Sequence, residues 1–403
     1  MGMDEGVHLG ARTGIDAHRI EFTGSGGEYF RVWIVNLLLT VVTFGLYTPF
    51  ARRRTARYFY GHTVVAGSPL EFTATKGRML AGFLLLVGLY VAFNVAAESD
   101  QQVATAVMLL GGAALAPYFW ASAMRFRMTS TRWRGVRLQF TASWPQVYRA
   151  AWPMLALALL GIAGATSITM LLPHAPIQHA RAAQAAPDLA HVGAALGVLF
   201  TIMLLSMAAA VVLDYNAKCL VVQHGRIGGQ SGRWKPLLSD FFRIWLAAAG
   251  LFIACVAVVV VAGAALALLV AGGMRSSGVV LIALVPLLVV LLAVAASAPA
   301  RAYRQARVFR LVWNNTGVSQ IARFKTRLRV RSYVFLRVRN ILLVIFTLGF
   351  YRPFAMVSEY RMRAESVTLH VKGSLDQLAG QLAREEHALG DAVAGAMGLD
   401  LVG

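Results

Sequence analysis

The chain has 403 residues and a formal net charge of +20, yet 58% of its residues are hydrophobic and only 14% are charged, with a mean hydropathy of +0.62. A soluble globule of this length needs more charged surface, so much of the chain must contact lipid. The cations stand in short clusters between apolar runs, as membrane topology signals do, and no nucleic-acid-binding motif accompanies them. We therefore expect no nucleic-acid partner.

The cysteine count and the N-terminus limit the remaining classes. The chain has two cysteines, Cys219 and Cys255, and Cys255 lies inside a long apolar run, which excludes a disulfide framework and a zinc site made of cysteines. Residues 1–28 contain no apolar region that ends in a small-residue cleavage site. We expect no removed signal peptide, so that the apolar segments themselves direct the chain to the membrane.

Apolar stretches long enough to cross a bilayer, about 20 residues each, occur six times. They lie near residues 78–97, 103–122, 150–173, 190–213, 244–273 and 277–300. Two further runs are shorter, because Val32–Tyr47 reaches only about 24 Å as a helix and Ile341–Tyr351 only about 16 Å. The predicted fold class is an all-α polytopic membrane protein: six long transmembrane helices, two short proline-terminated re-entrant or interfacial helices, and small cytoplasmic β-hairpins.

The basic loops predict the orientation, since loops rich in Lys and Arg stay on the cytoplasmic side. Such loops precede the first long stretch and follow the second, fourth and sixth: 52–78, 125–149, 218–243 and 301–331. The alternate loops are 98–102, the histidine-bearing 174–189 and the turn at Arg275. Both termini are then cytoplasmic. The alternative is eight transmembrane helices with both termini outside.

An internal repeat emerges when the chain is compared with itself. A proline closes an apolar run and an arginine follows eight positions later in four places: Pro49/Arg57, Pro117/Arg125, Pro299/Arg307 and Pro353/Arg361. A proline at a helix end breaks the backbone ladder, so each is interpreted as an elbow after which the arginine contacts anionic headgroups or a partner.

The segment after each elbow has alternating apolar residues around a turn, as in Thr63–Phe72, which predicts a β-hairpin. The same pattern covers Thr131–Phe140, and His18–Thr23 is a candidate additional strand. The chain is then divided into six segments. The first three are an N-terminal segment (1–31), a first elbow module (32–77) and two spans with the second module (78–149). The last three are two spans with a basic loop (150–243), two spans with the third module (244–332) and a C-terminal module with tail (333–403).

Two motifs at opposite ends of the chain carry a family resemblance. Phe22–Phe30 and Thr43–Ala51, with Asn36 and Arg57-Tyr58, strongly resemble the YjgN-like family of bacterial inner-membrane proteins, and Trp313–Thr316 and Thr347–Ala355 match its C-terminal pattern. The chain departs from the family where Phe50 and Phe354 replace the usual Trp, and where His62-Thr63 replaces an Asn-Thr pair. The resemblance implies an inner-membrane location and no mechanism, because the family's activity is uncharacterised.

Ionisable residues inside the apolar stretches would mark an enzyme or an ion-coupled transporter, and the chain has almost none. The intramembrane polar residues Asn36, Asn94 and Asn340 are expected to form hydrogen bonds between helices rather than to bind a substrate. Asp214 near Lys218 is interpreted as a helix-end carboxylate rather than a proton relay. No catalytic motif, metal site or cofactor is predicted.

Two weaker patterns receive structural interpretations. His174, His179 and His191 lie near one another but without the carboxylates or spacing of a metal site. The glycine-rich basic segment Gly225–Arg233 could approach phosphate, but it lacks the Walker ending and is interpreted as a flexible cytoplasmic loop.

The function predicted is a non-catalytic membrane protein whose basic elbows contact anionic lipid or a partner, with a homo-oligomer or membrane partner left open. A small-solute transporter or channel built from the repeats remains the alternative. A continuous polar cavity lined by the three asparagines would favour transport.

Overall fold

The fold is taken from a computed structural model, which describes residues 15–98, 102–171, 189–228, 230–273, 278–319, 322–372 and residue 380. The chain forms two compact units. We call the first the barrel unit, formed from residues 1–79, 128–139 and 226–403, and the second the helical unit, formed from residues 80–127 and 140–225.

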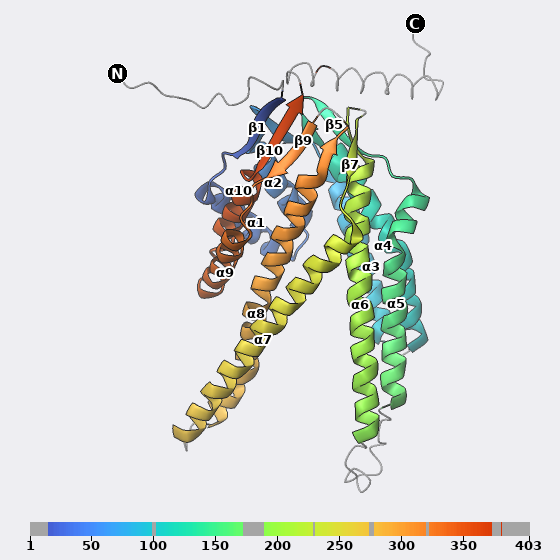
Figure 1. The fold of residues 1–403 in the computed structure, drawn as a ribbon, viewed down its shortest axis with the longest axis vertical. Helices are drawn as coiled ribbons and strands as arrows, with labels where there is room; N and C mark the ends of the chain where they lie inside the picture. Colours follow the sequence, from blue (N-terminus) through green and yellow to red (C-terminus); the bar gives the residue numbers. More distant parts are fainter. Residues whose placement is uncertain are drawn as a thin grey trace. The chain divides into compact units, whose positions relative to one another are not determined.

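The barrel unit is built on ten antiparallel strands that form one closed barrel, in the order β1-β10-β9-β8-β7-β6-β5-β4-β3-β2 (Figure 1). The strands are β1 (Ile15–Phe22), β2 (Thr63–Val65), β3 (Ser68–Phe72), β4 (Thr131–Trp133), β5 (Val136–Phe140), β6 (Gly225–Ile227), β7 (Gln230–Trp234), β8 (Thr316–Val318), β9 (Ala322–Thr326) and β10 (Val367–Lys372). Four hairpins therefore supply eight strands, and β1 and β10 close the ring between them.

The hairpin turns are tight because their central residues adopt left-handed backbone conformations. Ala66 and Gly67 have φ of 50° and 76°, and Arg134 and Gly135 have φ of 51° and 82°. Two consecutive positive φ angles are typical of the two-residue turn whose twist matches that of a β-hairpin. Glycine at the second position makes this turn accessible.

An apolar core fills the barrel wall on its inner side. Trp133, Val136, Ala322, Leu369 and Val371 are buried in one cluster. Burial alternates along β10, where Val367, Leu369 and Val371 are buried and the residues between them are not. This alternation is the period of two that places one strand face inward.

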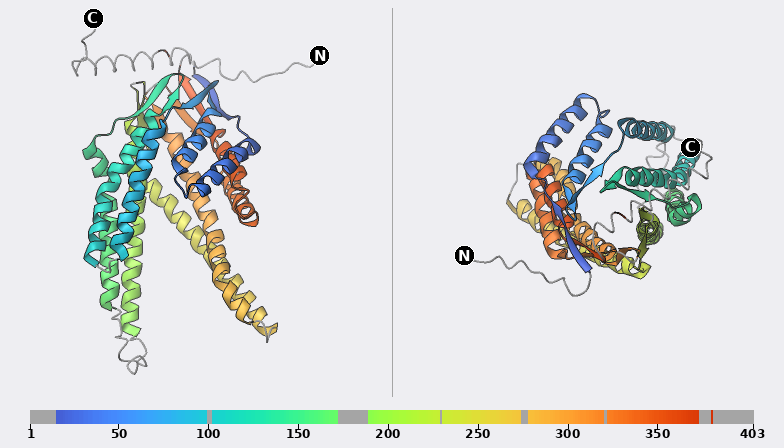
Figure 2. Two further views of the ribbon diagram at one scale, coloured as in Figure 1. Left: turned by 180° about the vertical axis from the view of Figure 1, so that it is seen from behind. Right: turned by 90° about the horizontal axis from the view of Figure 1, so that it is seen from above.

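The described residues of the barrel unit also form the helices α1 (Gly26–Val42), α2 (Thr48–Gly61), α7 (Leu238–Gly273), α8 (Gly278–Asn315), α9 (Val330–Phe346) and α10 (Arg352–Ala364). The α1–α2 hairpin connects β1 to β2, and the α9–α10 hairpin connects β9 to β10. Each of these strand pairs is hydrogen-bonded within the barrel, so both arms of each helical hairpin return to the same wall. The two hairpins pack together through α1 and α10 (Figure 2).

In the helical unit, the part of the chain that the structure describes forms α3 (Lys76–Glu98), whose first turn belongs to the barrel unit, α4 (Gln102–Thr129), α5 (Trp144–Leu171) and α6 (Leu189–His224). α5 and α6 pack along each other, and the Asn216 side chain donates to the Ala150 carbonyl at 2.8 Å. Gly164 permits close approach, since an added Cβ would lie 3.2 Å from Ile202.

The predicted all-α fold is wrong, because the hairpins are not small isolated elements but consecutive parts of one barrel. The expected hairpins at Thr63–Phe72 and Thr131–Phe140 are present, and the candidate strand at His18–Thr23 lies at β1. The error lies in their partners: an isolated hairpin is marginal in water, and here each gains neighbouring strands from sequence-distant hairpins.

The number of crossing helices also needs correction. Among the described residues, four helices are long and apolar enough to cross a membrane: they lie in α4, α5, α6 and α7. The apolar part of α3, Met79–Val95, is shorter. Within the predicted stretch 277–300, side chains are described only from Ser297 onward. A six-helix all-α bundle is therefore not the architecture.

The short apolar runs and the elbow prolines divide into two kinds. Val32–Tyr47 is not one helix, since α1 ends at Val42 and the chain turns back at Gly45 into α2. Pro49 and Pro353 stand in the first turns of α2 and α10, where a missing N–H is tolerated. Pro117 and Pro299 lie inside the continuous helices α4 and α8, so the helix-breaking interpretation is wrong there. One lost backbone bond does not end a long helix when neighbouring groups satisfy the freed carbonyl.

Candidate anion-binding site

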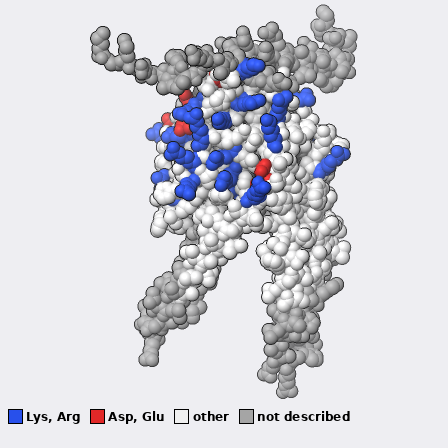
Figure 3. Space-filling view, in the orientation of Figure 1, with Lys and Arg blue, Asp and Glu red and all other residues white. Residues whose placement is uncertain are grey.

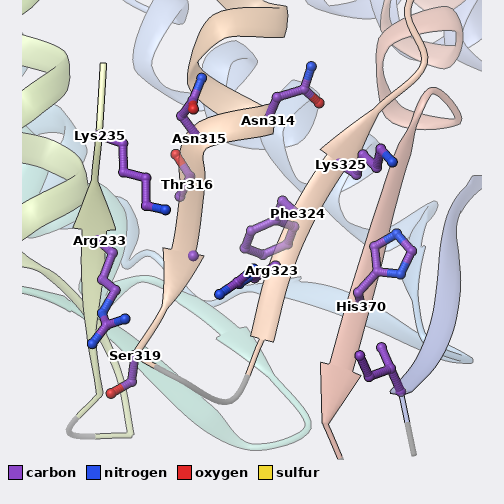
Figure 4. A pocket seen from close by; sticks show the side chains of 12 residues that line it. Arg233, Lys235, Asn314, Asn315, Thr316, Ser319, Arg323, Phe324, Lys325 and His370 are labelled. Carbon is purple, nitrogen blue, oxygen red and sulfur yellow. The ribbon is translucent and has the colours of Figure 1, made fainter. Parts of the chain in front are cut away.

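A pocket of about 560 Å³ opens on the barrel wall where β7, β8, β9 and β10 lie side by side (Figure 4). Its lining comes from these strands, from β1 and from the end of α8. The lining residues are Ile15, Arg233, Lys235, Asn314, Asn315, Thr316, Gly317, Ser319, Arg323, Phe324, Lys325 and His370. Four of the twelve are Lys or Arg and none is Asp or Glu.

Strand register brings the charged residues together. Arg233 pairs with Gly317, Gly317 pairs with Arg323, and Arg323 pairs with His370, so the four residues form one row across four strands. Residues directly opposite one another point to the same face of a sheet. Lys325 lies two positions along β9 from Arg323 and therefore extends the same face, and Lys235 follows the end of β7 and lines the same pocket.

Gly317 forms the floor between the two arginines. It is buried, and a Cβ added there would lie 3.2 Å from the Ala322 carbonyl oxygen and 3.8 Å from Cγ of Arg323. In Figure 4 Arg233 lies on one side of β8 and Arg323 on the other. The missing side chain thus keeps a hollow open between two guanidinium groups.

The local potential is positive, and His370 responds to it. Burial lowers the pKa of His370 below its ordinary value of 6.5, and the charges of Lys325 and Arg327 lower it further. The neutral ring is favoured because a protonated ring would be partly desolvated beside two cations. Like charges on one strand face also repel one another, a cost that a bound anion would offset.

Neutral groups complete the pocket. Thr316 uses its hydroxyl hydrogen on the Val312 carbonyl at 2.7 Å, which leaves the hydroxyl oxygen able to accept. The Asn314 side chain accepts from the Thr326 backbone N–H at 2.7 Å and so ties the end of α8 to β9. Phe324 also contributes to the lining, but it lies between Arg323 and Lys325 and packs on the opposite strand face, edge-on against Trp313 with ring centroids 5.0 Å apart. The pocket therefore combines several cations with neutral polar groups.

The four elbow arginines have different surroundings. Arg125 donates to the Ala142 carbonyl at 2.7 Å and stacks over Trp144 at 3.9 Å from the ring centroid. Arg361 donates to the Gly24 carbonyl at 2.6 Å and lies 3.8 Å from Glu365. Arg307 contacts the Tyr303 hydroxyl on its own helix at 3.2 Å, and Arg57 is exposed on α2. Contact with lipid or a partner stays a prediction for all four.

The three asparagines that were predicted to lie within the membrane also differ. Asn36 donates to the Ala51 carbonyl and Asn340 to the Ala355 carbonyl, both at 3.4 Å and both between two arms of a helical hairpin. Asn94 donates to the Tyr90 carbonyl of its own helix at 2.8 Å, so its expected interhelical bond is replaced by a local one. None of the three lines the described pocket.

Two further predictions concern the histidines and the segment Gly225–Arg233. No group of three or more His, Cys, Asp or Glu gathers within the described part of the chain, and His174 and His179 lie outside that part. Gly225–Arg233 is not a loop: it forms β6 and most of β7.

Sequence reasoning did not single out Lys235, Lys325 or Gly317. The signal that could have found the two lysines is the alternation Arg233-x-Lys235 and Arg323-x-Lys325, because cations two residues apart in a strand share a face. The pairing of β7 with β8 and of β8 with β9, which brings the two alternations together, has no local signal.

Comparison with known proteins places the chain in a family. Residues 17–396 match a family described as bacterial protein of unknown function (DUF898). Proteins named inner membrane protein YjgN are similar: that of Escherichia coli O157:H7 is 28% identical over 161 residues, 40% of either chain. That of Escherichia coli strain K12 is 30% identical over 32% of either chain. That of Salmonella typhimurium strain LT2 is 30% identical over 36% of this chain and 35% of the relative.

The aligned parts span less than half the length of these relatives. No solved structure matches the chain. The family match nevertheless runs through almost the whole chain, from β1 beyond β10. The chain therefore belongs to the DUF898 family of bacterial proteins of unknown function, is similar to the YjgN inner membrane proteins, and is a membrane protein with apolar helices of spanning length.

Proposed function

We propose that the chain is a non-catalytic, multi-pass protein of the bacterial inner membrane whose barrel lies on the cytoplasmic side with both termini. Its basic surface there binds anionic lipid headgroups. One observation carries this proposal: each long apolar helix has its cations at the end that joins a barrel strand.

The pattern holds in both chain directions. Helices that leave the barrel have cations near their first turns, as Lys76 in α3, Arg149 in α5 and Arg243 in α7. Helices that return to it have cations toward their last turns, as Arg127 in α4 and Lys218 in α6. In α8 the cations are Arg301, Arg304, Arg307 and Arg310. Figure 3 shows the Lys and Arg atoms over the strands and the helix segments that adjoin them, while the described length of α7 away from β7 carries none.

Two physical rules turn this pattern into an orientation and a ligand. Basic residues flanking apolar spans stay in the cytoplasm. The cytoplasmic leaflet is anionic and attracts each nearby Lys or Arg by about 1 kcal/mol. A surface with this many cations and few carboxylates is therefore matched to anionic headgroups.

An internal repeat is part of the proposal, and the two helical hairpins support it. Thr43 donates to Leu39 and accepts from the Tyr47 N–H at 2.7 and 3.0 Å, and Thr347 makes the same bonds with Leu343 and Tyr351 at 2.7 and 2.9 Å. The transport alternative has less support, because the side-chain N–H groups of Asn36 and Asn340 form hydrogen bonds between the arms of the helical hairpins.

The test is the lipid that remains bound to the full chain after mild extraction. We expect phosphatidylglycerol and cardiolipin to be enriched about twofold or more over the source membrane. Replacing Arg57, Arg125, Arg307 and Arg361 together by Gln should return the ratio toward that of the membrane.

The matched control replaces the same four residues by Lys, which keeps the charge and should keep the enrichment. Because Arg125 also binds a carbonyl and an aromatic ring, the unfolding temperature of each variant is measured alongside. Equal lipid ratios in the wild type, the Gln variant and the source membrane would contradict the proposal.

A further inference from the structure

We infer that the barrel pocket around Gly317 is a binding site for a phosphate group, carried either by a lipid headgroup or by a small soluble phosphate ester. This inference deepens the proposed function by naming one site, and it rests on that function only if the phosphate belongs to a lipid.

The geometry matches a tetrahedral oxyanion. Arg233 and Arg323 flank the buried Gly317 on neighbouring strands, which lie about 4.8 Å apart, so their Cα atoms are separated by roughly twice that spacing. Guanidinium groups present planar donor pairs that bind phosphate oxygens in a bidentate manner. A phosphate over Gly317 can accept from both arginines at once.

The charge matches a phosphate better than a carboxylate. Lys235 and Lys325 add two cations to the two arginines, and no carboxylate lines the pocket. Four cations exceed what a single carboxylate neutralises but suit a group with up to two charges. Structural charge rows usually contain compensating acids, as Glu71 pairs with Arg132 on the β3–β4 side of the same barrel.

The remaining lining indicates that the phosphate belongs to a larger molecule. A volume of about 560 Å³ lies in the range of small-molecule pockets and exceeds the need of a bare ion. Ile15 offers apolar surface beside the cations, and Ser319 offers a hydroxyl group. A phosphate ester with an uncharged organic part fits this combination.

The variants separate charge from shape. Arg233→Gln and Arg323→Gln each remove one guanidinium, and Gly317→Ala fills the hollow without changing charge. Arg19→Gln is the charge control, since Arg19 is an exposed arginine on β1 that does not line the pocket. Gly27→Ala is the shape control, since a Cβ added there meets nothing within 4 Å.

The first arm uses the full chain in nanodiscs of phosphatidylcholine and titrates inorganic phosphate and glycerol phosphate by calorimetry. If the ligand is a soluble phosphate ester, the wild type binds glycerol phosphate, and each of the three pocket variants weakens binding about tenfold or more. The two controls should bind as the wild type does.

The second arm uses nanodiscs that contain phosphatidylglycerol and phosphatidylcholine in equal amounts and measures the lipid retained on re-extraction. If the phosphate belongs to a lipid, the first arm gives no binding, and phosphatidylglycerol retention falls in the pocket variants but not in the controls. Unfolding temperatures verify that Gly317→Ala remains folded, and the two arginine variants keep the test valid if it does not.

The outcomes distinguish this site from the general surface. If Arg19→Gln lowers retention as much as Arg233→Gln, the site falls while the proposed lipid-binding function stands. If glycerol phosphate binds through the pocket but the chain shows no preference for anionic lipid, the proposed function falls while the site stands. Absence of any pocket-specific loss in both arms overturns the inference.

Discussion

The two helical hairpins α1–α2 and α9–α10 share a backbone but differ in the polar groups that hold their arms together. In both, a Thr, a left-handed residue and a Gly make the turn: Phe44 and Gly45 have φ of 47° and 89°, and Leu348 and Gly349 have φ of 48° and 96°. In both, an Asn of the first arm donates to an Ala carbonyl of the second at 3.4 Å.

The difference lies around that asparagine. Oδ1 of Asn36 accepts from Arg54 at 3.3 Å. Asn340 instead donates to Ser358 at 3.0 Å and to Glu359 at 3.2 Å, and Glu359 is also paired with Arg337. Asn340 is fully buried, whereas Asn36 retains 6% of its exposure. The turn residues thus specify the hairpin, while the bonds between the arms vary with the residues that flank them.

The largest effect should come from the asparagines. Asn340→Ala removes a fully buried amide whose two N–H groups are shared among the Ala355 carbonyl, Ser358 and Glu359, and it should cost roughly 2–3 kcal/mol of unfolding free energy. Asn36→Ala, with a guanidinium that can turn to solvent, should cost about 1 kcal/mol. Chemical unfolding of the two purified variants in the same detergent measures both. An equal or larger cost at Asn36 would show that the two hairpins do not differ in this way.

Substitution of the turn glycines should lower the unfolding free energy equally in the two helical hairpins, because the two turns share one backbone conformation. Gly45→Ala and Gly349→Ala each place a Cβ at positive φ and should cost about 1–2 kcal/mol through backbone strain. Space is not the cause, because a Cβ at either position meets nothing within 4 Å. Thermal unfolding of both variants tests this, and costs that differ by more than about 1 kcal/mol would argue against a common turn.

The smallest expected effect is a pH dependence of the unfolding free energy that arises from His370 on β10. The pKa of His370 is lowered by burial and by Lys325 and Arg327, so between this lowered value and 6.5 the unfolded chain binds more protons than the native chain. Unfolding free energy should therefore rise with pH across that window and level off above it. His370→Gln should flatten this part of the profile, and an unchanged slope would remove His370 as its cause.

Sequence alone predicted the local elements better than their assembly. Gly67 and Gly135 mark turns that only a left-handed conformation can close, and the apolar runs are long enough to be seen directly. The barrel was not predictable because β2, β4, β6 and β8 have only three residues each, and β1 pairs with β10 from the opposite end of the chain. Such pairings depend on which edges meet, and no local pattern specifies them.

The candidate site illustrates the same limit. Arg233 and Arg323 each fall in segments that the sequence marked, one as a basic glycine segment and one as part of the basic loop 301–331. Their approach requires β8 between them, with Gly317 at the shared register position. The charges were visible in the sequence, but the hollow between them was not.

Thiol labelling can determine whether the barrel lies on the cytoplasmic side, as we propose. The two native cysteines, Cys219 and Cys255, are first replaced by Ser, and Ser231→Cys then places a single thiol at an exposed position of β7. A membrane-impermeant maleimide should label this thiol in inverted membrane vesicles and leave it unlabelled in intact spheroplasts. Labelling in intact spheroplasts but not in inverted vesicles would place the barrel outside and overturn the proposed orientation.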